Sequence, residues 1–119
     1  MDEKMALASC TGMSALGLIS RAAVSDLVGE NEDLISICIT STACDKKAAL
    51  SLIKRFPIIA VNGCNNNCVN KILESKGVSV KETVDVSQHI DDYNAKNISR
   101  LGENEKHVDR IKNEINNLI

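Results

Sequence analysis

The chain has 119 residues, of which 44% are hydrophobic and 25% charged, and this is the size of one domain. Its formal net charge is −2, and Lys and Arg are spread along it, so the basic stripe that binds a nucleic-acid backbone is absent. One Phe, one Tyr and no Trp leave little with which to stack single-stranded bases. No segment approaches the roughly 20 apolar residues of a membrane span. We therefore expect one domain, residues 1–119, that binds neither nucleic acid nor membrane.

The cysteine content indicates thiol chemistry rather than disulfide bonding. The chain begins Met1-Asp2-Glu3-Lys4 and enters a short apolar run, without the basic segment and cleavage site of a signal peptide. This favours a cytoplasmic protein, and thiols are kept reduced in that compartment. Five cysteines there are better explained as metal ligands or reactive thiols than as a disulfide framework.

Apolar runs alternate with helical patterns from the start of the chain. A strand is predicted over 5–9 and, after a turn at 11–14, a helix over 15–28 with an apolar residue every three or four positions. Gly29 is expected to close that helix. The second strand is predicted over 34–39. A Thr/Ser turn follows it and leads into a helix that Pro57 stops.

The same alternation continues in the second half. Residues 58–61 form an aliphatic run that is typical of a strand covered on both faces. Asn62-Gly63 predicts a turn into a helix over 64–75, and a looser pattern over 78–86 predicts an edge strand. A terminal helix is expected to pack on the sheet, or alternatively to form a dimer contact, through an apolar stripe of Val108, Ile111, Ile115 and Leu118.

Strand–helix alternation of this kind predicts the fold class. Parallel strands joined by right-handed helical crossovers give an α/β domain with three layers. We expect a doubly wound, mainly parallel four-stranded sheet with helices on both faces and a C-terminal helix. Its core would span about 5–86, followed by a helical segment over about 89–119.

Four cysteines fall where such a fold places ligand sites. Cys10 ends the first predicted strand, Cys38 lies near the end of the second, and Cys64 follows the third. Parallel strands present their carboxyl ends at one edge of the sheet. Cys68, four residues after Cys64, would share a helix face with it. Cys10 and Cys64 would also stand at helix starts, where the helix dipole lowers a thiol pKa.

Four thiolates at one point are the ligand set of a structural zinc site. A [4Fe–4S] cluster uses the same ligands and stays open as an alternative. Cysteine also packs well as a small apolar residue, and this interpretation competes at Cys38 and is favoured for Cys44. His89, after the fourth predicted strand, is either a surface residue or a further ligand at the same edge.

The segment Asn62-Gly63-Cys64-Asn65-Asn66-Asn67-Cys68 resembles the DGC-domain family. That family has an Asp-Gly-Cys triplet, a second cysteine four residues later, and a helix that reads much like Lys71-Ile72-Leu73-Glu74-Ser75-Lys76-Gly77. Its early cysteine before a Ser/Gly turn is similar to Cys10 in Cys10-Thr11-Gly12-Met13-Ser14, and its cysteine after the second strand is similar to Cys38. The resemblance covers about residues 5–86.

The resemblance implies a zinc-binding protein whose metal ligands are Cys10, Cys38, Cys64 and Cys68. Two residues depart from the family pattern, because Asn62 replaces its Asp and Asn65 stands where Pro is usual. Loss of the carboxylate would alter the surroundings of the metal. We expect an accessory or redox-responsive role with another protein as partner, in a chain that is a monomer or a homodimer.

A second resemblance concerns Cys10 alone. A strand, Cys10-Thr11-Gly12-Met13-Ser14 and a helix are similar to the phosphocysteine loop of sugar phosphotransferase IIB subunits. That resemblance implies a phosphoryl carrier in which backbone N–H groups hold the phosphate on Cys10. It leaves the other cysteines unexplained. With only two His residues, both late in the chain, no hydrolase set is indicated, and a role other than enzyme is favoured.

Overall fold

The computed structural model describes residues 4–90 and 104–119. Its centre is a parallel sheet in the order β2-β1-β3-β4, built from β1 (Met5–Ser9), β2 (Leu34–Ile37), β3 (Ile58–Asn62) and β4 (Glu82–Asp85). The helical elements are α1 (Ala15–Glu30), α2 (Ile39–Ala43), α3 (Lys47–Arg55), α4 (Cys68–Ser75), the 3-10 turn η1 (Val86–Gln88) and α5 (Glu105–Asn116). The predicted α/β fold class and parallel sheet are confirmed.

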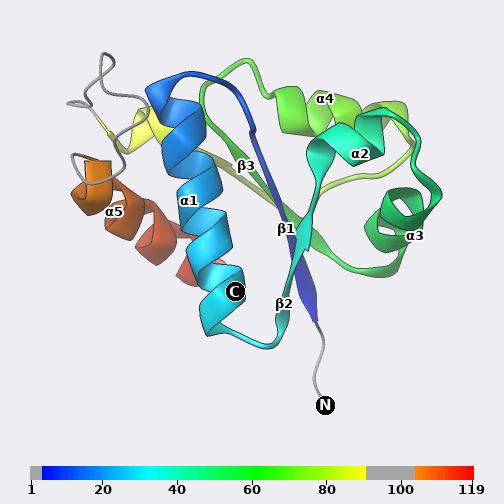
Figure 1. The fold of residues 1–119 in the computed structure, drawn as a ribbon, viewed down its shortest axis with the longest axis horizontal. Helices are drawn as coiled ribbons and strands as arrows, with labels where there is room; N and C mark the ends of the chain where they lie inside the picture. Colours follow the sequence, from blue (N-terminus) through cyan, green and yellow to red (C-terminus); the bar gives the residue numbers. More distant parts are fainter. Residues whose placement is uncertain (1–3, 91–103) are drawn as a thin grey trace.

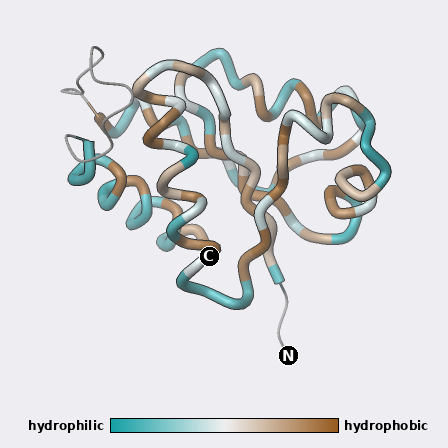
Figure 2. The backbone as a smooth tube through the Cα atoms, viewed as in Figure 1, coloured by the Kyte–Doolittle hydropathy of each residue, from teal (hydrophilic) through white to brown (hydrophobic). Residues whose placement is uncertain are grey.

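The sheet lies between two helical layers, because alternate side chains of its strands point to opposite faces. Figure 1 shows α1 and α5 on one face and α2, α3 and α4 on the other. Leu7 of β1 joins the apolar cluster with α1 and α5, whereas its neighbours Ala6 and Ala8 join the cluster with α3 and α4. In Figure 2 the hydrophobic colour accordingly runs along the central strands. β3 is buried along its whole length, as its aliphatic sequence predicted.

The sheet places β4 at an edge, as expected, but several element bounds differ from the sequence-based expectation. α1 continues through Gly29 and ends at Glu30, because a Gly in helical conformation need not stop a helix. The second strand ends at Ile37, and the predicted Thr/Ser turn is the short helix α2. β4 is limited to Glu82–Asp85, where it pairs with β3.

The apolar stripe of the terminal helix α5 is buried in the core of the domain. Val108, Ile111 and Ile115 join the apolar cluster on the α1 face, and Ile111 and Ile115 are completely buried. This confirms packing in the core layer, although the principal neighbour is α1 rather than the sheet alone. The part of the predicted C-terminal helical segment that falls in 91–103 lies outside the described residues.

Among residues 4–90 and 104–119, no helix has the length and apolar character required to cross a membrane.

Candidate thiol site at the carboxyl edge of the sheet

The strand order creates a topological switch point at the centre of the sheet. From β1 the chain crosses to β2 on one side, and β3 and β4 then add on the other side. In open α/β sheets, ligands bind outside the carboxyl ends of the two strands that flank such a point. These strands are β1 and β3. Cys10 directly follows β1 and Cys64 lies two residues after β3, so both cysteines belong to the loops that border the switch point.

The loop after β1 contacts the Cys10 sulfur through a backbone N–H group. The backbone N–H of Cys10 donates to the carbonyl of Val61 at 2.8 Å and thereby extends the pairing with β3. The backbone N–H of Gly12 donates to Cys10 Sγ at 3.3 Å. Ser14 then caps α1, with its Oγ accepting the N–H of Gly17 at 3.2 Å. Cys10 therefore follows directly after β1, as predicted, but Ser14 rather than Cys10 stands at the start of α1.

Glycines allow the two loops at the switch point to approach each other closely. A Cβ at Gly17 would overlap the Gly12 carbonyl oxygen, so the loop lies directly against the first turn of α1. A Cβ at Gly63 would stand 3.2 Å from the backbone N of Gly17 and from the carbonyl carbon of Leu16. The Gly63 backbone thus packs on α1. The loops that carry Cys10 and Cys64 meet at the start of α1.

The predicted helix over 64–75 is wrong in its first turn. α4 begins at Cys68, and Cys64 lies in the turn before it. Asn67 has φ 54° and ψ 44°, a left-handed conformation that asparagine tolerates better than most residues, and it ends the turn before α4 starts. Cys64 is therefore neither at a helix start nor on a shared helix face with Cys68.

Cys68 stands at the start of α4 and is exposed. Asn66 Nδ2 donates to Cys68 Sγ at 3.0 Å, and Lys71 Nζ donates to Asn66 Oδ1 at 3.1 Å. The amide of Asn66 thus connects a cationic side chain to the sulfur. Asn66 is one of three consecutive asparagines, Asn65 to Asn67, in the turn before α4.

Asn62 replaces the family's Asp, and the structure gives it a structural role. Its side chain is 1% exposed. Its Oδ1 accepts the N–H of Val69 at 3.0 Å, and its Nδ2 donates to Asn70 Oδ1 at 2.6 Å. Asn70 Nδ2 in turn donates to Thr83 Oγ1 at 2.9 Å. This chain of amides ties the end of β3 to the first turn of α4 and to β4.

Cys38 is exposed, so its interpretation as a buried apolar residue is wrong. It is the N-cap residue of α2 rather than a member of β2, because the strand pairing ends at Ile37. The Ser41 hydroxyl lowers the pKa of the Cys38 thiol by hydrogen bonding to it. The backbone N–H groups of Ser41 and Thr40 and the charge of Lys46 act in the same direction, while desolvation partly opposes them.

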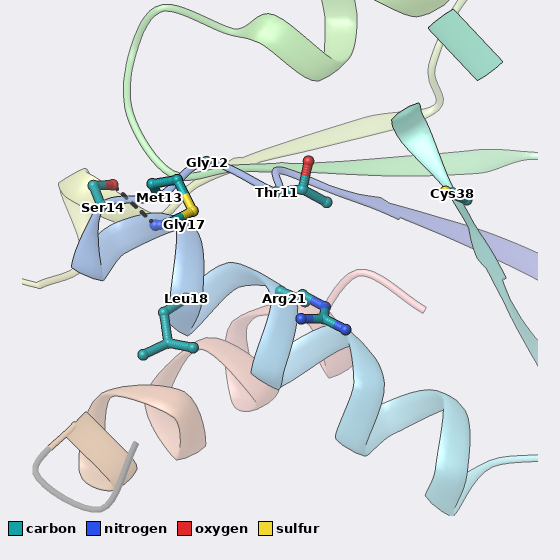
Figure 3. Close-up of a pocket in the computed structure, with 8 residues that line it drawn as sticks. All are labelled: Thr11, Gly12, Met13, Ser14, Gly17, Leu18, Arg21 and Cys38. Carbon is teal, nitrogen blue, oxygen red and sulfur yellow. Dashed lines mark hydrogen bonds between the residues drawn. The ribbon is translucent and has the colours of Figure 1, made fainter. Parts of the chain in front are cut away.

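A pocket of about 430 Å³ lies beside Cys38 on the α1 side of the sheet edge. Figure 3 shows the loop after β1 above it, α1 below it and Cys38 at its far end. The residues that line it are Thr11, Gly12, Met13, Ser14, Gly17, Leu18, Arg21 and Cys38. Cys10, in contrast, packs against the apolar cluster on the opposite face of the sheet.

The donor chemistry suits zinc, but the described residues do not form a finished site. All five cysteines are free thiols, and four of them are exposed while Cys10 is half-buried. Within 4–90 and 104–119, no group of three or more His, Cys, Asp or Glu is arranged to hold a metal ion. The expected convergence of four sulfurs is therefore not present in this conformation. One reason is that Cys38 faces the α1 side and Cys10 the other.

Neither Cys44 nor His89 belongs to the two loops that border the switch point. Cys44 is exposed and is the C-cap residue of α2, so the favoured interpretation of it as a buried apolar residue is wrong. His89 follows η1, and its Nδ1 lies 3.8 Å from Glu114 Oε1 of α5. The charge of Glu114 thus gives His89 a partner on the terminal helix.

Comparison with known proteins is consistent with the cysteine pattern. A family model for the DGC domain matches residues 6–115, which is nearly the whole chain. The chain belongs to the DGC-domain family. The match extends beyond the predicted 5–86 into α5, so this DGC domain includes the terminal helix in its family fold. No curated protein and no solved structure was found to match it.

Several residues of this edge carried little sequence signal. Gly17 sits in a helical pattern and is indistinguishable there from a tolerated glycine, and Arg21 has the spacing of an ordinary solvated residue. Ser41 lies in a stretch that was interpreted as a turn. Asn62-Gly63 predicted a turn, but not the hydrogen bonds that the Asn62 amide makes with Val69 and Asn70.

Proposed function

We propose that this DGC domain binds a zinc ion through cysteine thiolates at the switch point of its sheet. The observation that carries the proposal is the placement of Cys10 and Cys64 in touching loops after neighbouring strands, with Cys68 at the start of α4. Thiolates are favoured zinc ligands, and Cys38 is the fourth candidate. Because the described sulfurs are not grouped for a metal, binding would have to draw them together, as metal binding commonly does when it is coupled to folding.

Purified protein should then contain about one zinc per chain, measured by elemental analysis together with the protein concentration. Cys10→Ser, Cys64→Ser and Cys68→Ser should each lose the metal. Cys44→Ser is the matched control, because Cys44 is also an exposed thiol but lies outside the candidate set. The Cys38→Ser variant decides between three and four protein sulfurs. Metal-free protein that takes up no zinc would disprove the proposal.

An iron–sulfur cluster is the alternative for the same ligands. A [4Fe–4S] cluster absorbs broadly in the visible region, whereas zinc does not. Anaerobic purification followed by an absorbance spectrum and iron analysis therefore separates the two. We further propose a cytoplasmic location and a protein partner for an accessory or redox-responsive role, supported by five thiols that all remain unbridged.

One contact favours a second candidate function, a phosphocysteine carrier. The Gly12 N–H points at Cys10 Sγ from a loop that enters the N-terminus of a long helix, and such N–H groups also stabilise phosphate oxygens. Metal-free protein incubated with phosphoramidate should then gain a thiol-linked phosphoryl group at Cys10, and the Cys10→Ser variant should not. Phosphorylation at the other cysteines, or none, would remove this candidate.

A further inference from the structure

The pocket beside Cys38 combines a thiol with a cation in one cavity. It has a volume of about 430 Å³, large enough for a small organic molecule. One wall is the loop after β1, the floor is the first two turns of α1, and Cys38 closes one end (Figure 3). Arg21 contributes the only charged side chain among its lining residues.

Arg21 is available for an anion. It forms no ion pair or hydrogen bond with another side chain in the part of the chain that the structure describes. A guanidinium binds a carboxylate in a planar, bidentate arrangement. The pocket should therefore bind a ligand that carries a carboxylate better than a cationic ligand.

The rest of the lining is suited to the aliphatic part of such a ligand. Leu18 lies on the floor, and the Met13 side chain is 85% exposed beside the pocket. An exposed methionine is a flexible apolar group that can cover a bound molecule. The pocket therefore offers an apolar floor, one guanidinium and one accessible sulfur.

We propose that this pocket binds a low-molecular-weight disulfide that carries carboxylates, and that Cys38 becomes thiolated in it. Cys38 Sγ loses its proton to solvent and attacks one sulfur of the disulfide. A new S–S bond forms at Cys38 as the S–S bond of the ligand breaks, and the second half leaves as a thiolate that takes up a proton. The Cys38 thiol is oxidised to the mixed disulfide, and half of the ligand is reduced to a thiol.

The pocket includes Cys38 but none of Cys10, Cys64 and Cys68, so the inference requires only that the Cys38 thiol is free of metal. Both properties can be measured separately on the same protein. Thiolation is tested on full-length chain freed of metal with a chelator, and zinc content is tested on the untreated preparation.

The experiment compares two small disulfides of similar size, 3,3′-dithiodipropionate with two carboxylates and cystamine with two amines. Peptide mass spectrometry follows the rate of thiolation at Cys38 and at Cys44 in the same sample. Cys44 is the internal control, because it is exposed at the other end of α2 and does not line the pocket. We expect the anionic reagent to be preferred at Cys38 relative to Cys44.

Arg21→Gln should lower the rate of Cys38 with dithiodipropionate by about two- to fivefold, the range of one exposed ion pair, and should raise the cystamine rate, because a like charge is removed. Arg21→Lys should restore part of the preference, and added salt should weaken it. Since Arg21 is exposed, neither variant is expected to alter the circular dichroism spectrum. Equal charge preference at Cys38 and Cys44, or a preference that survives Arg21→Gln, would overturn the proposal.

Discussion

Asn62 Oδ1 accepts a hydrogen bond from the backbone N–H of Val69 at 3.0 Å. Asn62 is the last residue of β3, and Val69 lies in the first turn of α4, where backbone N–H groups have no partner inside the helix. The bond therefore closes the loop that contains Cys64 and joins the first turn of α4, which begins at Cys68, to the end of β3. A carboxylate at this position could accept the same bond, but it could not donate to Asn70 Oδ1 as the Asn62 amide does.

Asn62→Ala should lower the free energy of unfolding by about 1–3 kcal/mol, because it leaves the buried Val69 N–H and its Asn70 neighbour without their partner. Asn62→Asp should cost less, since it keeps the acceptor for Val69. Urea denaturation measures both. Asn113→Ala, at an exposed position of α5, is the control and should change stability little. Equal losses for Asn62→Ala and Asn113→Ala would contradict the structural role of Asn62.

Gly17→Ala should destabilise the protein by about 1–3 kcal/mol, because the new methyl group would collide with the Gly12 carbonyl oxygen. Gly29→Ala is the matched control in the same helix. Nothing lies within 4 Å of a Cβ at Gly29, so the higher helix propensity of alanine should stabilise the protein by up to about 1 kcal/mol. Thermal unfolding of the two variants should show opposite shifts of Tm. A higher Tm in both variants would mean that the loop at Gly12 can move away from the new methyl group without loss of stability.

The pH dependence of Cys38 reactivity tests its hydrogen bond with Ser41. The lowered pKa means that the Cys38 thiolate persists to lower pH than an ordinary thiolate would. Ser41→Ala removes the main cause, so the pKa of Cys38 should rise and its alkylation by iodoacetamide should slow at neutral pH. Rates between pH 6 and 10, followed by peptide mass spectrometry, locate the midpoint. Ser51→Ala, on the exposed face of α3, should leave it in place, and an unshifted midpoint in Ser41→Ala would refute the assignment.

Two adjacent residues of α5, Ile111 and Lys112, allow the contribution of apolar packing to stability to be compared with that of ion pairing. Ile111→Ala should cost about 2–5 kcal/mol, because Ile111 is completely buried in the cluster with α1. Lys112 Nζ lies 2.7 Å from Glu30 Oε2 and 3.5 Å from Asp26 Oδ2 of α1, both of which are largely exposed. Lys112→Ala should therefore cost less than about 1 kcal/mol, and less still at high salt. Chemical denaturation at two ionic strengths checks both values. A larger loss for Lys112→Ala would show that charge holds α5 in place.

The sequence by itself determined the fold class of this DGC domain and the edge that carries its cysteines. Apolar runs separated by helical patterns can bury both faces only in a parallel sheet between two helical layers, so the positions of Cys10 and Cys38 relative to the strands followed from local pattern. The four-cysteine spacing also led to the family, which the match over 6–115 confirms.

Only the tertiary structure decided which thiols are neighbours and what surrounds them. Strand order and register place Cys10 and Cys38 on opposite faces of the edge, and one left-handed residue, Asn67, moves Cys64 out of α4. The contact between Gly12 and Gly17 and the bond from Asn62 to Val69 join the loops to helix starts. Local periodicity cannot predict such relations, because side-chain direction at a loop depends on the backbone that packs against it.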